Sequence, residues 1–406
     1  MTSRERVTAT LNHQEPDELA IDFGGMRSTG IHIIAYNQLV KHLGLSLDPP
    51  RLYDVFQQLA EPQPEVVACL GGDVVQAHQR HPAFGIAIDG AWHPYTLKNG
   101  DVVQVPEDYC PIRENGGEYL YNDGIKVAYR PESSLYFDQI VHPFEACESE
   151  TDIDHVPLTA WTEQDLDFMV NEIKTLHETT DKAILFAFGG NIFEAGQLDF
   201  GYEAFYTNLL IEPDMMHYYF NRITDIHLSN LERLLARAGK YLQVVQFGDD
   251  LGTQQAQQIS TTTYRNLIKP YHARQFRFVQ NHYPAVRVFL HSCGAIEPLI
   301  PDLIDAGVQV LNPVQLSARG MNPMHLKKEY GHALSFWGGG SNTSETMTNA
   351  SPEQVRQESA ALLEIFAPGG GYVFNQVHNI QPGVPMENIL AAYDAALSYR
   401  KAHRRG

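Results

Sequence analysis

The sequence predicts a (β/α)8 barrel, because short apolar segments rich in strand-forming residues alternate with longer segments of helical spacing. Such alternation is typical of parallel βαβ units, and eight of these units close most naturally into a barrel. A doubly wound open sheet is the alternative, but no G-x-G-x-x-G motif follows the first predicted strand, which weakens it. The eight predicted strands cover residues 19–23, 73–78, 184–190, 242–248, 286–293, 308–313, 334–339 and 372–377.

Helices are predicted before the first strand and between most of the others. Thr2 and Glu5 have the spacing of a capping box, so the chain is expected to open with a helix rather than a leader segment. The clearest later helical segments are residues 203–239, 263–282 and 352–369.

One segment departs from the alternation. Residues 84–140 contain WHPYTLKNGDVVQV and EYLYNDGIKVAYR, in which NG and DG dipeptides separate alternating residues, the usual signature of β-hairpins. We therefore expect an antiparallel insertion after strand two. It would form either a lid over the barrel mouth or an oligomer contact, such as one between two copies in a homodimer. The whole chain, 1–406, is otherwise predicted to be one domain.

Composition excludes several classes of function. The formal net charge of -20 disfavours binding to nucleic acid or to anionic membranes, since both would repel the protein. No apolar run reaches the roughly 18 residues that a membrane-spanning helix needs. The four cysteines are scattered at positions 69, 110, 147 and 293, which favours a reducing compartment. A cytoplasmic protein is expected.

Polar residues at the ends of predicted strands are the main functional signal, because barrel active sites form at the carboxyl ends of the strands. His291 and Cys293 end strand five, and residues at i and i+2 of a strand point the same way. His378 follows strand eight at the same end. Imidazole and thiolate suit zinc, whose catalytic sites commonly have three protein ligands. A packed cysteine and a hydrogen-bonded histidine are the alternative.

Asp249 and Asp250 follow strand four, next to the proposed metal site. Either one is a candidate catalytic acid or base, or a further metal ligand. Alternatively, the Asp-Asp-Leu-Gly sequence caps a helix or shapes a turn.

Five further residues are candidates for substrate binding. Gly339 lies in the glycine run after strand seven, where backbone N–H groups can hold an anion, although glycines there can also serve only a tight turn. Arg27 and Glu194 follow strands one and three, and each can equally be a surface charge. Asn312 and Gln315 end strand six.

Three segments resemble the uroporphyrinogen decarboxylase superfamily. FNQVHNIQPGVPMENI, at 374–389, is similar to its C-terminal signature, and TSRERVTATLNHQEPDELAIDF resembles its opening helix and first strand. HSCGAIEPLIPDLIDAGVQVLNPVQ resembles the methyltransferase branch, where an H-x-C motif at strand five binds zinc. The resemblance covers nearly the whole chain apart from the insertion, and it implies a barrel enzyme.

Departures from the family patterns separate the branches. True decarboxylases carry an arginine-rich motif after strand one, whereas this chain has FGGMRSTGIH there, with Arg27 as the one arginine. They also carry an aspartate after strand two, whereas this chain has AHQRHP, without a carboxylate. Uroporphyrinogen decarboxylation is therefore not expected. Relatives in the methyltransferase branch usually have a second cysteine near the last strand, whereas here His378 stands at that place and no cysteine follows Cys293.

The resemblance thus implies a corrinoid-dependent methyltransferase with zinc held by His291, Cys293 and His378. It would act with a partner protein carrying methylcobalamin or a related corrinoid, on a small-molecule methyl donor or acceptor. Two other functions stay open. One is a metal-free decarboxylase of a smaller carboxylate, with Arg27 as anchor and an aspartate stabilising the protonated intermediate. The other is a non-catalytic protein that binds a corrinoid or tetrapyrrole.

Overall fold

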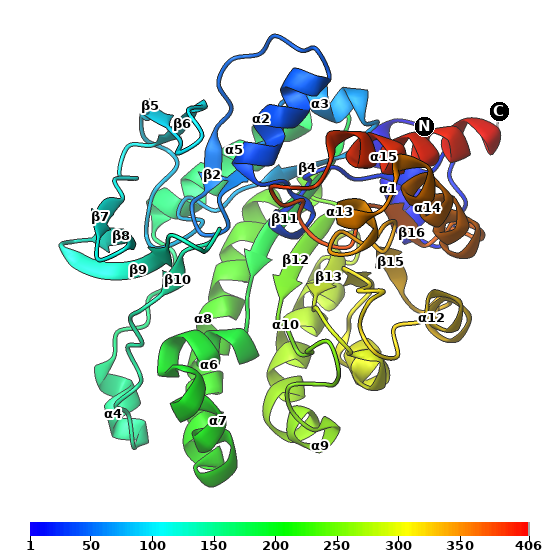
Figure 1. Ribbon diagram of the computed structural model, residues 1–406. Coiled ribbons are helices and arrows are strands. Elements are labelled where there is room, and N and C mark those ends of the chain that lie inside the picture. The colour runs from blue at the N-terminus through cyan, green and yellow to red at the C-terminus, as the bar shows by residue number, and fades with distance from the viewer. Residues whose placement is uncertain (405–406) are drawn as a thin grey trace.

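A computed structural model describes residues 1–404 and shows an eight-stranded parallel sheet that curls into a barrel (Figure 1). Each predicted strand is present, which confirms the predicted fold class. Neighbouring strands follow the order β1-β16-β15-β14-β13-β12-β11-β4. The strands are β1 (Ala20–Ile21), β4 (Val74–Ala77), β11 (Ala183–Gly189), β12 (Val244–Gly248), β13 (Arg287–His291), β14 (Val310–Asn312), β15 (Ser335–Trp337) and β16 (Tyr372–Phe374).

Asp73 joins the two ends of the sheet, β1 and β4. Its backbone N–H donates to the carbonyl of Ile21 at 2.7 Å, and its carboxylate accepts the Ile21 N–H at 3.0 Å. The same carboxylate pairs with Arg6 of α1 (Ser3–Leu11) and Arg400 of α15 (Met386–Ala402). The first and last helices therefore meet at the seam that nearly closes the barrel.

Alternate residues of the strands fill the barrel interior, as the two-residue period of a strand requires. Each of the eight strands contributes to one buried interior cluster, and Val7 and Leu11 of α1 belong to the same cluster. The intervening residues face the surrounding helices. The interior members from the strands are Ala20, Val74, Ala183, Leu185, Val244, Phe289, Val310, Trp337 and Val373.

Helices cover the outside of the barrel, and the predicted first helix begins with a capping box between Thr2 and Glu5. The predicted helix over 203–239 is two helices, α7 (Tyr202–Ile211) and α8 (Pro213–Ala238), because Pro213 lacks the N–H that would continue the first of them. The remaining elements are α2 (Ile33–His42), α3 (Pro64–Cys69), α4 (Glu150–His155), α5 (Glu163–Thr179), α6 (Phe193–Phe200), α9 (Thr261–Thr263), a π-helical turn (Tyr264–Ile268), α10 (Lys269–His282), α11 (Ile300–Ala306), α12 (Pro323–Tyr330), α13 (Thr346–Asn349) and α14 (Pro352–Phe366).

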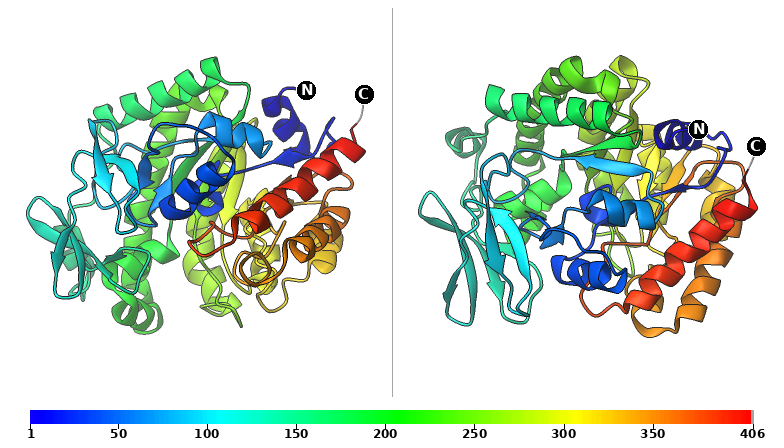
Figure 2. Two further views of the ribbon diagram at one scale, coloured as in Figure 1. Left: turned by 45° about the horizontal axis from the view of Figure 1, so that its top comes forward. Right: turned by 90° about the horizontal axis from the view of Figure 1, so that it is seen from above.

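The predicted hairpin insertion is present between β4 and β11, and it lies beside the barrel on the side away from the chain ends (Figure 2). Asp123 and Gly124, both at positive φ, form the turn between β8 (Gly117–Asn122) and β9 (Ile125–Pro131). A further hairpin, β2 (Leu52–Asp54) and β3 (Leu59–Ala60), was not predicted, since such short strands show no alternation. The insertion contains β5 (Trp92–Thr96), β6 (Val102–Pro106), β7 (Ile112–Glu114), β8 (Gly117–Asn122), β9 (Ile125–Pro131) and β10 (Asp138–Gln139).

Across residues 1–404, no helix is both long enough and apolar enough to span a bilayer.

Candidate metal and active site

Three side chains from two strand ends meet above the barrel. His291 ends β13, Cys293 follows two residues later, and His378 follows β16. One ligand atom from each residue lies within 4.8 Å of the other two, and Cys293 Sγ is 3.3 Å from His291 Nε2. His291 is buried, and the other two side chains are partly exposed. The fold therefore brings together two imidazoles and a thiol that are far apart in sequence.

Both imidazoles are oriented by asparagine side chains. Nδ1 of His291 lies 2.5 Å from Oδ1 of Asn312, whose amide donates to the Trp337 carbonyl at 2.7 Å. Nδ1 of His378 lies 2.8 Å from Oδ1 of Asn379. An amide oxygen can only accept, so each Nδ1 carries the proton and each Nε2 has a free lone pair. Metal-binding histidines are commonly held by such carbonyl partners.

The electrostatics of the metal-free site favour neutral groups. Burial, and next the neighbouring His291, lower the pKa of His378 to about 4. Burial, followed by the charges of Asp250 and Glu194, raises the pKa of the Cys293 thiol. A cation bound here would stabilise the thiolate, and two imidazole nitrogens with one sulfur are a donor set that suits zinc. The residues fit the ion that the sequence predicted.

Asp250 borders this cluster. Its Oδ1 accepts the Cys293 N–H at 2.7 Å and lies 3.6 Å from Nε2 of His291. Glu194, at the first turn of α6, lies beside it and accepts a hydrogen bond from Asn191 at 2.8 Å. Burial, and next the charges of Asp250 and Asp249, raise the pKa of Glu194 to about 8. Two predicted residues thus form the acidic edge of the site.

Asp249 faces away from the cluster and has a structural role. Its carboxylate is fully buried and accepts hydrogen bonds from three backbone N–H groups that start α6, at 2.7 to 3.0 Å. It also lies 2.8 Å from Nε2 of buried His272. These contacts occupy both carboxylate oxygens, so Asp249 caps α6, as the alternative interpretation of the sequence proposed. Its catalytic role stays a prediction.

A cavity of about 510 Å³ opens beside Cys293 and His378. Gln315, one of the predicted substrate-binding residues, lines it and accepts the Gly294 N–H at 2.7 Å. Tyr136 reaches the cavity from the insertion, and its hydroxyl donates to Asn379 at 3.1 Å. The insertion therefore contributes one side chain, Tyr136, to the lining of the cavity.

Three other predicted substrate-binding residues do not face the cavity. Arg27 forms an ion pair with fully buried Asp54 and donates to the Pro82 carbonyl at 2.8 Å. Gly339 is buried at positive φ, and a Cβ there would lie 3.1 Å from Val314, so glycine permits the close approach of two chain segments. Asn312 is fully buried and positions His291 instead of touching a ligand.

Sequence reasoning missed Asn379 and Tyr136. Asn379 directly follows His378, so the sequence already placed a side-chain amide next to a candidate histidine ligand. That neighbour could have predicted that the imidazole ring is held by a hydrogen bond. Tyr136 lies in an insertion with no motif of its own, and nothing in the sequence indicated that it would reach the loop after β16.

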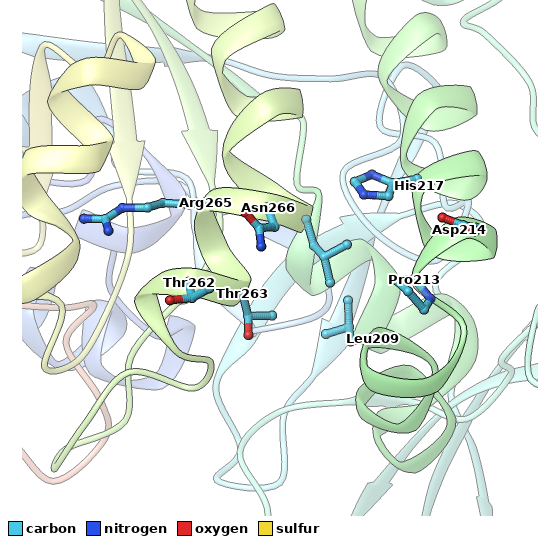
Figure 3. A pocket seen from close by; sticks show the side chains of 9 residues that line it. Leu209, Pro213, Asp214, His217, Thr262, Thr263, Arg265 and Asn266 are labelled. Atoms are coloured by element: carbon cyan, nitrogen blue, oxygen red, sulfur yellow. The ribbon is translucent and has the colours of Figure 1, made fainter.

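A larger hollow, of about 700 Å³, lies in the outer helical layer (Figure 3). Figure 3 shows Leu209, Pro213 and His217 on one side of it and Thr263, Arg265 and Asn266 on the other. The charge of Arg265 is already paired with Asp302, at 2.9 Å. The barrel-mouth cavity is the better candidate because it adjoins the metal-binding cluster.

The chain is similar in sequence to known proteins. The sequence profile described as uroporphyrinogen decarboxylase (URO-D) matches residues 124–399, more than half of the chain. The chain belongs to the uroporphyrinogen decarboxylase family. The uroporphyrinogen decarboxylase of Pseudoalteromonas atlantica is 22% identical over 305 residues, which cover 71% of this chain and 79% of that enzyme.

Other members of the family match over shorter segments. The uroporphyrinogen decarboxylase of Actinobacillus succinogenes is 34% identical over 85 residues, and the match spans only 23% of that enzyme's length. Among solved structures, a methyltransferase from Methanosarcina mazei superposes with a TM-score of 0.64 and 14% identity, covering 98% of this chain and 99% of that one. At this identity the likeness shows a shared fold, with a methyltransferase as a structural neighbour of this family member.

Proposed function

We propose that this protein is a corrinoid-dependent methyltransferase that uses a zinc ion at the barrel mouth. The observation that carries the proposal is the oriented trio of His291, Cys293 and His378, whose ligand atoms lie within 4.8 Å of one another beside a cavity. Zinc bound by these residues would supply a Lewis acid that activates a thiol or polarises a methoxy oxygen.

The protein's own residues prepare this site. Asn312 and Asn379 fix the two rings, and the resulting preorganisation avoids the cost of ordering the ligands when the ion binds. Asp250 holds the loop of Cys293 through its backbone N–H. Glu194, with its pKa raised to about 8 by burial and then by Asp250, keeps a proton near neutral pH and limits the negative charge beside the thiol.

A corrinoid carried on a partner protein would need to approach this mouth. An exposed aromatic side chain beside the acidic edge of the site would contribute to such docking, because exposed apolar surface commonly marks interaction sites. Tyr202 is 62% exposed at the start of α7, within electrostatic reach of Glu194 and Asp250.

The metal-free decarboxylase has less support. It needs Arg27 to anchor a carboxylate, and that guanidinium is already paired with Asp54. The cavity beside Cys293 has no arginine or lysine among the described residues that line it. A substrate with several carboxylates would find no cation there.

The proposal is tested by metal analysis and methyl transfer on the purified full chain. Wild type and the control Cys69→Ser, an exposed cysteine on α3, should bind equimolar zinc and transfer a methyl group between cobalamin and an acceptor or donor. Cys293→Ser and His378→Ala should lose zinc and reduce transfer by about 100-fold or more. Absence of zinc together with full activity of Cys293→Ser would overturn the proposal. Corrinoid binding without turnover would instead favour the non-catalytic function.

A further inference from the structure

The two histidines of the metal-binding cluster are held by different parts of the chain. Asn312, the partner of His291, is fully buried in the barrel and donates to a backbone carbonyl there. Asn379, the partner of His378, is anchored instead by side chains from outside the barrel strands. The orientation of His378 therefore depends on segments that the barrel itself does not supply.

Tyr136 of the insertion is one of these anchors. Its hydroxyl accepts a hydrogen bond from Gln381 Nε2 at 2.6 Å and donates to Asn379 Oδ1 at 3.1 Å. The same oxygen of Asn379 accepts the Nδ1–H of His378 at 2.8 Å. A hydroxyl that accepts one hydrogen bond becomes a stronger donor of the next, so these contacts reinforce each other. They connect the insertion to a metal ligand.

The loop between β2 and β3 holds the other side of Asn379. Gln57 accepts a hydrogen bond from Asn379 Nδ2 at 2.9 Å. Phe56 packs beside Tyr136, with ring centroids 6.3 Å apart, and its carbonyl accepts the N–H of buried Phe137 at 3.1 Å. Tyr136 and Gln57 thus approach Asn379 from two separate segments, and each limits the rotation of its amide.

The Tyr136 hydroxyl remains a donor at neutral pH. Burial raises the pKa of Tyr136 to about 12, and the hydrogen bond to Asn379 lowers it by less. Since an amide oxygen can only accept, the direction of the contact with Asn379 is fixed. Loss of this hydroxyl would leave Gln57 as the anchor of Asn379 from outside the loop after β16.

We infer that Tyr136 is a positioning residue for the metal site: through Asn379 it holds the His378 imidazole with Nε2 free for the ion. This inference rests on the zinc site of the proposed function. It also gives the insertion a function, because Tyr136 is the one residue of 84–140 among the described residues that line the cavity beside Cys293.

Tyr136→Phe removes the hydroxyl and keeps the ring. In the full chain it should weaken zinc binding about fivefold, equivalent to ~1 kcal/mol, the usual contribution of one neutral hydrogen bond. Competition with a chromophoric chelator measures the affinity. Tyr129→Phe removes a hydroxyl from the same insertion, at a ring that packs on Tyr119 away from the cavity, and should bind zinc as wild type does. Wild-type affinity in Tyr136→Phe would overturn the inference.

A double-mutant cycle shows whether Tyr136 acts through Asn379. The combined variant Tyr136→Phe/Asn379→Ala should bind zinc no more weakly than Asn379→Ala alone, because the connection to His378 is already broken. Additive losses would mean that Tyr136 acts by another route, and would contradict the assigned role.

Nitrogen NMR of the metal-free protein with labelled histidine separates this inference from the proposed function. His378 should show one tautomer in wild type, protonated at Nδ1, and a mixture of tautomers in Tyr136→Phe; His378→Ala assigns the signal. Absence of zinc from wild type would reject the proposed function, while the change of tautomer would still show that Tyr136 orients His378. Zinc binding and methyl transfer, with affinity and tautomer unchanged in Tyr136→Phe, would do the reverse.

Discussion

Oδ1 of Asn312 lies 2.5 Å from Nδ1 of His291, and Oδ1 of Asn379 lies 2.8 Å from Nδ1 of His378. The two histidines come from separate strand ends, yet the same kind of contact fixes both rings with Nε2 free. Each asparagine has a further partner, since Asn312 donates to the Trp337 carbonyl and Asn379 to Gln57. The orientation of the rings is therefore built into the fold before any ion binds.

The first prediction concerns these asparagines. Asn312→Ala and Asn379→Ala should each lower zinc affinity about 10- to 100-fold, because a freely rotating imidazole binds metal less well. Competition with a chromophoric chelator measures the affinity. Asn221→Ala, an exposed asparagine of α8, is the control and should bind zinc as wild type does. Wild-type affinity in both site variants would show that the contacts do not position the ligands.

The second prediction separates the adjacent aspartates. Asp249→Asn should lower the free energy of unfolding by about 3 kcal/mol, since it removes the charge that caps α6 and faces His272. Asp250→Asn should change stability little and affect zinc affinity or methyl transfer instead. Urea denaturation of the metal-free proteins measures the difference. A stable Asp249→Asn protein that retains zinc and lacks activity would support the catalytic role first predicted for Asp249.

The third prediction concerns pH. The pKa of Glu194, raised by burial and then by Asp250 to about 8 from an ordinary 4.5, means that the folded protein keeps a proton that the unfolded chain loses. The contribution of Glu194 to stability is therefore complete below pH 4.5 and is lost as the pH rises toward 8. In the metal-free protein, Glu194→Gln should remove this part of the decline in the free energy of unfolding with rising pH. Denaturation midpoints between pH 5 and 8 measure it.

Glu203→Gln, which removes the same charge from an exposed position on α7, is the matched control for this effect. If stability declined with rising pH at the same slope in wild type and in Glu194→Gln, Glu194 would not be protonated in the folded protein.

The fourth prediction concerns Arg27. Arg27→Ala leaves the buried carboxylate of Asp54 without its ion pair and should destabilise the protein by about 2 kcal/mol, less than for a fully buried pair because Arg27 is partly exposed. Zinc affinity should not change. Adding Asp54→Asn should recover part of the loss, which a double-mutant cycle by thermal or urea denaturation detects. Loss of catalysis at wild-type stability would instead support the decarboxylase alternative.

Some features of the fold follow from short stretches of sequence and were therefore predictable. The eight strands were predictable because each is a short apolar run, and parallel strands joined by helices must place their carboxyl ends at one edge. That rule was enough to bring His291, Cys293 and His378 to the same end of the barrel as candidates. It could not say whether their ligand atoms would lie within reach of one ion, which the structure places within 4.8 Å.

The sequence by itself determined the barrel, the insertion and the identity of the metal-binding candidates, since these follow from periodicity and strand order. Only the tertiary structure decided which way adjacent side chains point, so that Asp249 caps α6 while Asp250 faces Cys293. Likewise, it alone paired Arg27 with Asp54 and brought Tyr136 of the insertion to Asn379, leaving a cavity lined without charge. The physical reason is that orientation and pairing depend on contacts between segments distant in sequence, which no local pattern encodes.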